Sequence, residues 1–135
     1  MRETQVQLAV AGVVTPEMLS VAGAEGLDAD LLRTRVAEGQ IVLPIGGNRK
    51  ANLVGIGMGL RTKVNASIGT STDIVDLDAE IRKAKAAESA GADTLMELSV
   101  GGDLDQIRRE ILAAVQLPVG NVPLYQAFCE ATAKF

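Results

Sequence analysis

The sequence contains no histidine and no tryptophan, a single cysteine, and only 2% aromatic residues. Without histidine the chain lacks the side chain that most often carries protons near neutral pH and most often binds metals. One cysteine, Cys129, cannot form a disulfide within the chain, which suits a reducing compartment. A catalytic triad, a zinc site or a cysteine–histidine pair therefore cannot be assembled from these residues alone.

Basic residues are in the minority, with 13 Lys and Arg against 17 Asp and Glu. The net charge of −4 leaves no basic surface for a polyanion, so we do not expect nucleic acid as a partner. No run approaches the roughly 20 apolar residues of a membrane span. The short apolar run 8–14 favours an N-terminal helix over a signal peptide, because Thr15-Pro-Glu17 follows it. We expect a cytoplasmic protein without a membrane partner.

Residues 1–51 predict a small helical and β-hairpin region. Thr15, followed by proline, and Asp28 are typical of helix N-caps. The stretch 52–60 has glycines at alternate positions, as a dinucleotide-binding loop does, but a strand rather than a helix follows it. We therefore interpret it as a glycine-rich hairpin.

Residues 52–135 predict the first βα units of an incomplete barrel. Strands are expected at 62–68, 94–99 and 119–124, with helices at about 76–90, at 104–116 and from 125 onward. Tandem strand–loop–helix units imply parallel strands joined by right-handed crossovers. The predicted fold class is α/β, a partial (β/α) barrel of about three units, since a closed barrel needs eight.

The residues of this region also predict a site. The first strand alternates, which places Lys63, Asn65 and Ser67 on one face. Ser67, Met96 and Tyr125 follow one another at intervals of 29 residues near strand ends, the edge that carries the site in barrels. Other roles stay open: Met96 in the core, Tyr125 sealing the end of the sheet, and Lys63 as an end-of-strand residue.

Three further residues have structural interpretations. Glu97 points away from the face of Met96, so we expect it to pair with a cation under the helices. Arg108 and its neighbour lie on the polar face of their helix and need no function. Cys129 is expected to fill space in the interior.

Three segments, in this order, resemble the phosphomethylpyrimidine synthases of thiamine biosynthesis: VNASIGTS (64–71), GADTLMELS (91–99) and PVGNVPLYQ (118–126). The motifs VTPEM (14–18) and VAEGQIVLP (36–44) fit the same family. The resemblance implies a radical S-adenosylmethionine lyase that rearranges 5-aminoimidazole ribotide into hydroxymethylpyrimidine phosphate. It also implies a [4Fe–4S] cluster and a second metal site in the complete enzyme.

The resemblance assigns substrate-binding residues one by one. The family's methionine of the second strand and tyrosine after the third strand contact the ribotide, and they correspond to Met96 and Tyr125. A family asparagine falls at Ser67, which alters that contact, while Asn65 matches an asparagine two residues earlier in the motif. No catalytic residue and no metal ligand is assigned within this chain.

The family's three cluster cysteines lie near its C-terminus, its metal-binding histidines also lie downstream, and this sequence has neither. We therefore expect an N-terminal fragment that binds none of the cofactors and does not cleave S-adenosylmethionine on its own. The resemblance is also compatible with a homodimer.

Three alternatives remain open. The related 5-hydroxybenzimidazole synthases of anaerobic cobamide synthesis use the same ribotide, and the change at Ser67 suits them too. Thiamine synthesis comes first because it is the more widespread activity. The chain could also be a non-catalytic ribotide-binding module, or an incomplete chain whose open sheet edge is stabilised by self-association.

Overall fold

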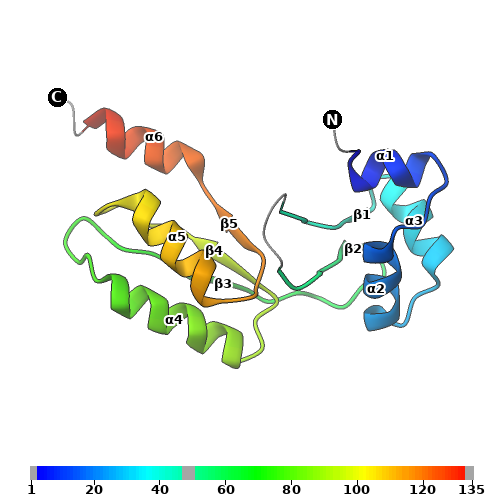
Figure 1. Cartoon of the computed structure of the whole chain (residues 1–135), viewed down its shortest axis with the longest axis horizontal. Coiled ribbons are helices and arrows are strands. Elements are labelled where there is room, and N and C mark those ends of the chain that lie inside the picture. Colours follow the sequence, from blue (N-terminus) through cyan, green and yellow to red (C-terminus); the bar gives the residue numbers. More distant parts are fainter. Residues whose placement is uncertain (1–2, 47–50, 133–135) are drawn as a thin grey trace. The chain divides into compact units, whose positions relative to one another are not determined.

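The computed structural model describes residues 3–46 and 51–132. Its contacts divide the chain into two compact units, Met1–Lys63 and Val64–Phe135 (Figure 1). The domain boundary after residue 51 stays a prediction, since this division reflects contacts alone. No helix in the described ranges is long and apolar enough to cross a membrane.

The first unit contains three short helices and two short strands. They are α1 (Gln5–Val10), α2 (Pro16–Glu25), α3 (Ala29–Ala37), β1 (Ile41–Val42) and β2 (Ile56–Gly57). Each helix begins at a cap whose side chain accepts a hydrogen bond from the backbone N–H three residues later: Thr4, Thr15 and Asp28. The caps predicted at Thr15 and Asp28 are thereby confirmed.

The glycine-rich stretch 52–60 is one arm of a hairpin rather than a hairpin by itself. Its strand β2 pairs antiparallel with β1, with Gly57 opposite Ile41. A Cβ at Gly57 would lie 2.1 Å from the Gln40 carbonyl oxygen, and the φ of Gly57 is +145°. Only glycine fits at this crossing of two backbones, because any side chain would meet the opposite strand.

The interior of the first unit is aliphatic. The unit also contains an ion pair with little exposed surface. Its buried core residues are Ala9, Met18, Val21, Ala22, Leu32, Val36 and Ile41. Glu25, the last residue of α2, accepts hydrogen bonds from Lys63 Nζ and from the Arg61 backbone N–H, both at 2.8 Å. The side chains of Glu25 and Lys63 are 9% and 6% exposed. The predicted place of Lys63 on a strand is wrong, because the strand begins only at Asn65 and Lys63 is held by Glu25.

The second unit alternates three parallel strands with three helices. They are β3 (Asn65–Ile68), α4 (Leu77–Ser89), β4 (Thr94–Glu97), α5 (Leu104–Ala114), β5 (Val119–Asn121) and α6 (Pro123–Thr132). The strands lie in the order β3-β4-β5, and both pairs are parallel. The α/β class and the three βα units are therefore confirmed, with strands shorter than the sequence predicts.

The sheet has two different faces. On one face Ile68 and Leu95 are buried against α4 and α5, which lie side by side (Figure 1). The strand register places a second set on the opposite face: Asn65, Ser67, Thr94, Met96 and Gly120. Successive strand residues alternate between faces, so burying one set leaves the other set on the far side of the sheet.

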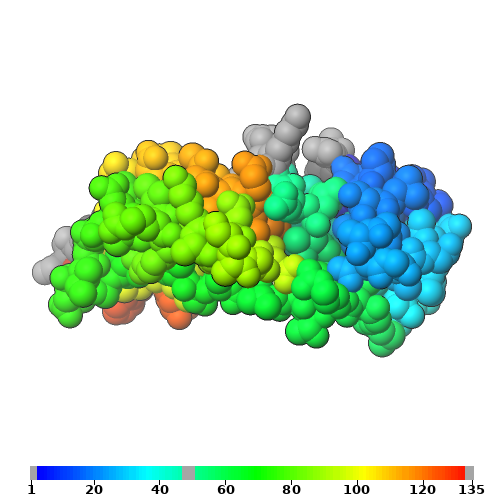
Figure 2. All heavy atoms as spheres, turned by 90° about the horizontal axis from the view of Figure 1, so that it is seen from below, coloured from blue at the N-terminus to red at the C-terminus, as the bar shows by residue number. Residues whose placement is uncertain are grey.

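The outer side of α4 faces solvent, as Figure 2 shows in green. Arg82, Lys83 and Lys85 are exposed there, as the helical pattern predicts. On the inner side the pattern predicts aliphatic residues, and Ala84 is fully buried. Glu80, one turn earlier, is also buried, which the pattern does not predict.

Acidification should weaken the first unit through Glu25. Burial alone would raise the pKa of Glu25, but the hydrogen bonds from Lys63 and Arg61 outweigh it and hold the pKa below its ordinary value. Such a group stabilises the fold above its unfolded pKa of about 4.3, and this contribution is lost as pH falls through the folded pKa. We expect the melting temperature of the chain to fall when the pH is lowered below about 4.3, partly because this group is protonated there.

The substitution Glu25→Gln isolates this contribution. It should lower the free energy of unfolding at pH 7 by roughly 1.5–3 kcal/mol, because a charge-assisted hydrogen bond is lost. It should also flatten the acid limb of the midpoint–pH curve, measured by circular dichroism. Glu38→Gln, at the exposed end of α3, is the control and should change neither quantity. Superimposable acid limbs for wild type and Glu25→Gln would contradict the assignment.

Candidate functional site

The polar face of the sheet brings together three of the four residues predicted to bind substrate. Ser67 and Met96 are register partners on adjacent strands, and Asn65 lies two residues before Ser67 on the same face. Asn65 Oδ1 accepts a hydrogen bond from Thr94 Oγ1 at 2.9 Å. The amide of Asn65 also carries two N–H donors, and the Ser67 hydroxyl can both donate and accept. This face therefore offers exposed polar groups beside one thioether.

Met96 of β4 has Gly120 of β5 as its register partner. A Cβ at Gly120 would come within 2.7 Å of Met96 Sδ. The missing side chain at Gly120 thus makes room for the thioether, which is a soft group that packs well against aromatic rings. Gly120 is a residue of the site that neither the strand pattern nor the resemblance indicates.

Tyr125 is not a strand neighbour of Met96. β5 ends at Asn121 and α6 begins at Pro123, which is suited to a first helical position, so Tyr125 falls in the first turn of α6. Its side chain is 45% exposed. The interval of 29 residues matches the register between β3 and β4 but not the register between β4 and β5. A ligand shared by all four residues stays a prediction.

Tyr125 lines an open apolar groove of about 730 Å³. Leu124 and Phe128 of α6 contribute to it and are 73% and 68% exposed. Thr72 and Val100, which belong to the loops after β3 and β4, complete its wall. The groove therefore lies at the carboxyl edge of the sheet.

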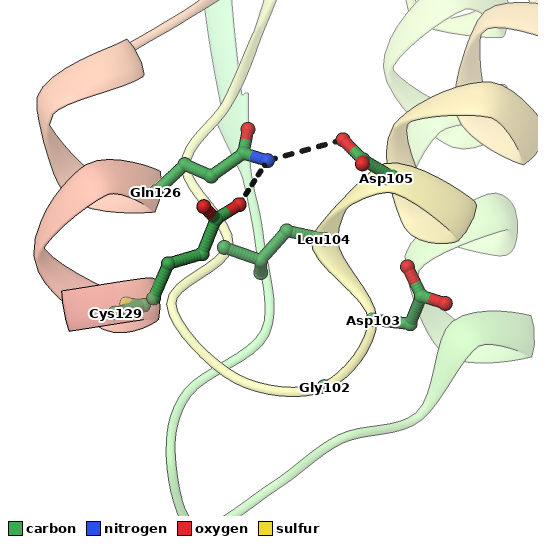
Figure 3. Close-up of a pocket in the computed structure, with 7 residues that line it drawn as sticks. Gly102, Asp103, Leu104, Asp105, Gln126 and Cys129 are labelled. Carbon is green, nitrogen blue, oxygen red and sulfur yellow. Dashed lines mark hydrogen bonds between the residues drawn. The ribbon is translucent and has the colours of Figure 1, made fainter. Parts of the chain in front are cut away.

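A smaller pocket of about 260 Å³ lies between α5 and α6 (Figure 3). Gln126 Nε2 donates hydrogen bonds to Asp105 Oδ1 at 3.1 Å and to Glu130 Oε1 at 2.8 Å. Figure 3 shows the Gln126 amide nitrogen with both hydrogen bonds, one of which reaches the labelled Asp105. The hydrogen bond to Asp105 links α6 to α5, whereas the one to Glu130 stays within α6. The pocket contains none of the predicted site residues.

Buried polar groups join the two loops at the carboxyl edge. Thr70, after β3, donates its backbone N–H to Ser99 Oγ at 3.0 Å. Its hydroxyl donates to the Gly101 carbonyl oxygen at 2.6 Å. Glu80 of α4 accepts the Gly69 N–H at 2.8 Å. Sequence reasoning missed these contacts, although the spacing of Glu80 and Ala84, one helical turn apart, could have indicated a buried carboxylate.

The cation predicted for Glu97 is confirmed, because Glu97 Oε2 lies 3.6 Å from Arg108 Nε. Glu97 is 2% exposed and lies on the helix-covered face. Arg108 is thus the counter-charge of a buried carboxylate, a structural role that the sequence did not predict. Its position on a mostly polar helix face concealed this role.

The cofactors that the resemblance implies do not fit the residues present. In the ranges 3–46 and 51–132, no group of three or more His, Cys, Asp or Glu is placed to hold a metal ion. Cys129 is partly buried, and its Sγ donates to the Val100 carbonyl oxygen at 3.4 Å. An iron–sulfur cluster needs several cysteine thiolates, so no chemical step is assigned to such a group here.

Comparison with known proteins matches residues 4–135 to the Radical SAM ThiC family. The chain is 65% identical to the 5-hydroxybenzimidazole synthase of Desulfuromonas acetoxidans and 63% identical to that of Geobacter metallireducens, each over 133 residues. It is 64% identical over 123 residues to the phosphomethylpyrimidine synthase of Methanoregula boonei. The alignments cover 98%, 98% and 91% of this chain but 31%, 31% and 29% of these relatives. The chain thus spans about a third of their length.

The substitution Gly120→Ala should move the Met96 thioether and leave the fold intact. The added methyl group meets a flexible side chain rather than backbone, so the free energy of unfolding should change by about 1 kcal/mol or less. The ε-methyl resonance of Met96 should shift in ¹³C-methyl NMR spectra, while that of Met18 stays in place. Gly23→Ala, where the methyl group meets nothing within 4 Å, is the control and should shift neither. A stationary Met96 resonance in Gly120→Ala would show that Gly120 does not set its position.

Proposed function

The chain belongs to the radical SAM ThiC family, and from this membership we propose that it is the N-terminal part of a 5-hydroxybenzimidazole synthase acting on 5-aminoimidazole ribotide. Three relatives of that name, identical at 62–65% of 133 positions, support this product. The motifs fit both enzymes, and thiamine synthesis is the first expectation only because that activity is more widespread. The identities favour the alternative, which therefore comes first.

Phosphomethylpyrimidine synthase is the second candidate. The relative of that name in Methanoregula boonei, 64% identical over 123 residues, supports it. Both reactions would begin from the same ribotide. The role proposed for this segment, binding the ribotide, is therefore the same for either product.

The observation that carries the binding role is the Ser67–Met96 register pair on the polar face of the sheet. A ribotide combines a flat heteroaromatic ring with hydroxyl and phosphate oxygens. The Met96 thioether is suited to the ring, because sulfur packs favourably against aromatic faces and edges. The Ser67 hydroxyl, the Asn65 amide and the Tyr125 phenol supply donors for the oxygens. We assign these four residues to substrate binding and none to catalysis.

The cofactors belong to the rest of the enzyme in this proposal. The family implies a [4Fe–4S] cluster and S-adenosylmethionine, which supply the radical that starts the rearrangement, and a metal ion. One cysteine and no histidine do not suffice to hold them. This chain would bind and orient the ribotide and would be inactive alone. A homodimer and a cytoplasmic location stay predictions.

Product analysis tests the choice between the two enzymes. The full-length protein, with its cluster reconstituted, is supplied with ribotide, S-adenosylmethionine and a reductant, and the products are separated by liquid chromatography with mass detection. We expect 5-hydroxybenzimidazole. Hydroxymethylpyrimidine phosphate would instead support the second candidate. Ribotide binding without turnover would support the non-catalytic module. The 135-residue chain, tested in parallel, should form neither product.

Removing the predicted ligand groups tests the pocket. Met96→Ala and Tyr125→Ala in the full-length protein should each raise the ribotide Kd about tenfold, which corresponds to about 1.4 kcal/mol of lost contact. Isothermal titration calorimetry measures this change. Met58→Ala, which removes an exposed methionine of the first unit, is the matched control and should leave the Kd within about twofold. An unchanged Kd in both site variants would remove the assignment.

A further inference from the structure

Two carboxylates are buried beneath the carboxyl edge of the sheet and take no part in the site described above. Glu80 of α4 is 4% exposed, and Glu97 at the end of β4 is 2% exposed. A carboxylate that leaves water needs hydrogen bonds and a counter-charge to replace its hydration. Both carboxylates find hydrogen-bond donors in the backbone of the loops that border the site.

Glu80 holds the first loop where it leaves β3. Its Oε2 accepts the Gly69 N–H at 2.8 Å, and its Oε1 is paired with Lys83. A Cβ at Gly69 would lie 2.6 Å from both the Leu98 carbonyl carbon and the Ser99 nitrogen. At Gly69, which Glu80 hydrogen-bonds, the first loop therefore lies directly against the residues that follow β4.

Glu97 holds the second loop through a chain of contacts. Its Oε1 accepts the Ser99 N–H at 2.7 Å, and its Oε2 faces Arg108. Ser99 Oγ in turn accepts the Thr70 N–H, which belongs to the first loop. The Val100 N–H returns a hydrogen bond to the Thr70 carbonyl oxygen at 3.1 Å. The two carboxylates thus fix both loops at their first residues.

We propose that Glu80 and Glu97 are positioning residues of the ribotide site, an inference that rests on the proposed function. They set the places of Thr72 and Val100, which line the groove beside Tyr125. Glu97 lies on the helix-covered face, opposite to Ser67 and Met96, so it acts through the loops rather than by contact with ligand. Preorganised loops bind a ligand more tightly, because less ordering is needed on binding.

The chain offers a matched control at the other end of α4. Glu88 Oε1 accepts the Gln116 N–H at 2.6 Å and so holds the segment before β5, at the amino edge of the sheet. Like Glu80→Gln, the substitution Glu88→Gln removes the charge of an α4 carboxylate that accepts a hydrogen bond from a loop N–H. It does so at the amino edge of the sheet, away from the candidate site. A purely structural role predicts similar behaviour for both variants.

The experiment measures the ribotide Kd of the full-length protein and of three variants: Glu80→Gln, Glu97→Gln and Glu88→Gln. All measurements are made well below the lowest melting temperature of the set. We expect the Kd to rise about tenfold in Glu80→Gln and Glu97→Gln, as the loss of one charge-assisted hydrogen bond implies, and less than about twofold in Glu88→Gln. Glu97→Gln should show the larger effect, since its amide group would place a donor against Arg108.

A further variant and a second measurement keep the test decisive if a Glu→Gln variant folds poorly. Ser99→Ala keeps both carboxylates paired and removes only the link to Thr70, and it should also raise the Kd. Hydrogen–deuterium exchange should accelerate in residues 69–75 and 98–103 of the two carboxyl-edge variants, with the strand around Leu95 unchanged.

The outcomes separate the inference from the function on which it rests. A wild-type protein that binds ribotide, with Glu80→Gln, Glu97→Gln and Ser99→Ala all resembling Glu88→Gln, overturns the inference alone. Equal losses of affinity in all three Glu→Gln variants also overturn it. A wild-type protein that does not bind ribotide overturns the proposed function, and the inference with it.

Discussion

Strand side chains alternate between the two faces of a sheet, and in the second unit this constraint decides which residues enter the core and which lie on the face of the candidate site. One face carries Ile68 and Leu95 and is covered by α4 and α5, so its interior is mostly aliphatic, with Glu97 buried at the end of β4. The other face carries Ser67 and Met96 as a consequence of the same alternation. A shift of one residue in register would exchange the faces. Core packing and site geometry are therefore secured by the same contacts.

A second constraint acts at the carboxyl edge, where backbone N–H groups and two carboxylates are buried together and lose their hydration. Glu80 and Glu97 are stable there because loop N–H groups and cations replace their hydration. The loops also approach each other closely, since a Cβ at Gly101 would lie 2.2 Å from the Ser71 carbonyl oxygen. The two loops therefore have few alternative arrangements at this edge of the sheet.

The division of labour proposed for the enzyme follows from these features. Relatives that carry two different names match this segment at 65% and 64% identity. A segment that binds a shared ribotide and leaves the radical chemistry to other parts of the protein accounts for that similarity. The single cysteine, Cys129, donates a hydrogen bond to the Val100 carbonyl oxygen beside the groove.

The sequence by itself determined the features that depend on residues close together in the chain. Helix starts at Thr15 and Asp28 follow from local capping, and the face of the sheet that Glu97 occupies follows from alternation along one strand. The family motifs are local as well, which is why Met96 could be singled out without coordinates.

Only the tertiary structure decided the contacts between distant residues. It paired Lys63 with Glu25, buried Glu80 beneath the loop after β3, and began α6 at Pro123, two residues before the predicted start at Tyr125. The physical reason is that a side chain's partner depends on which elements meet in space. Local periodicity reports which face a residue occupies, but not what lies opposite that face.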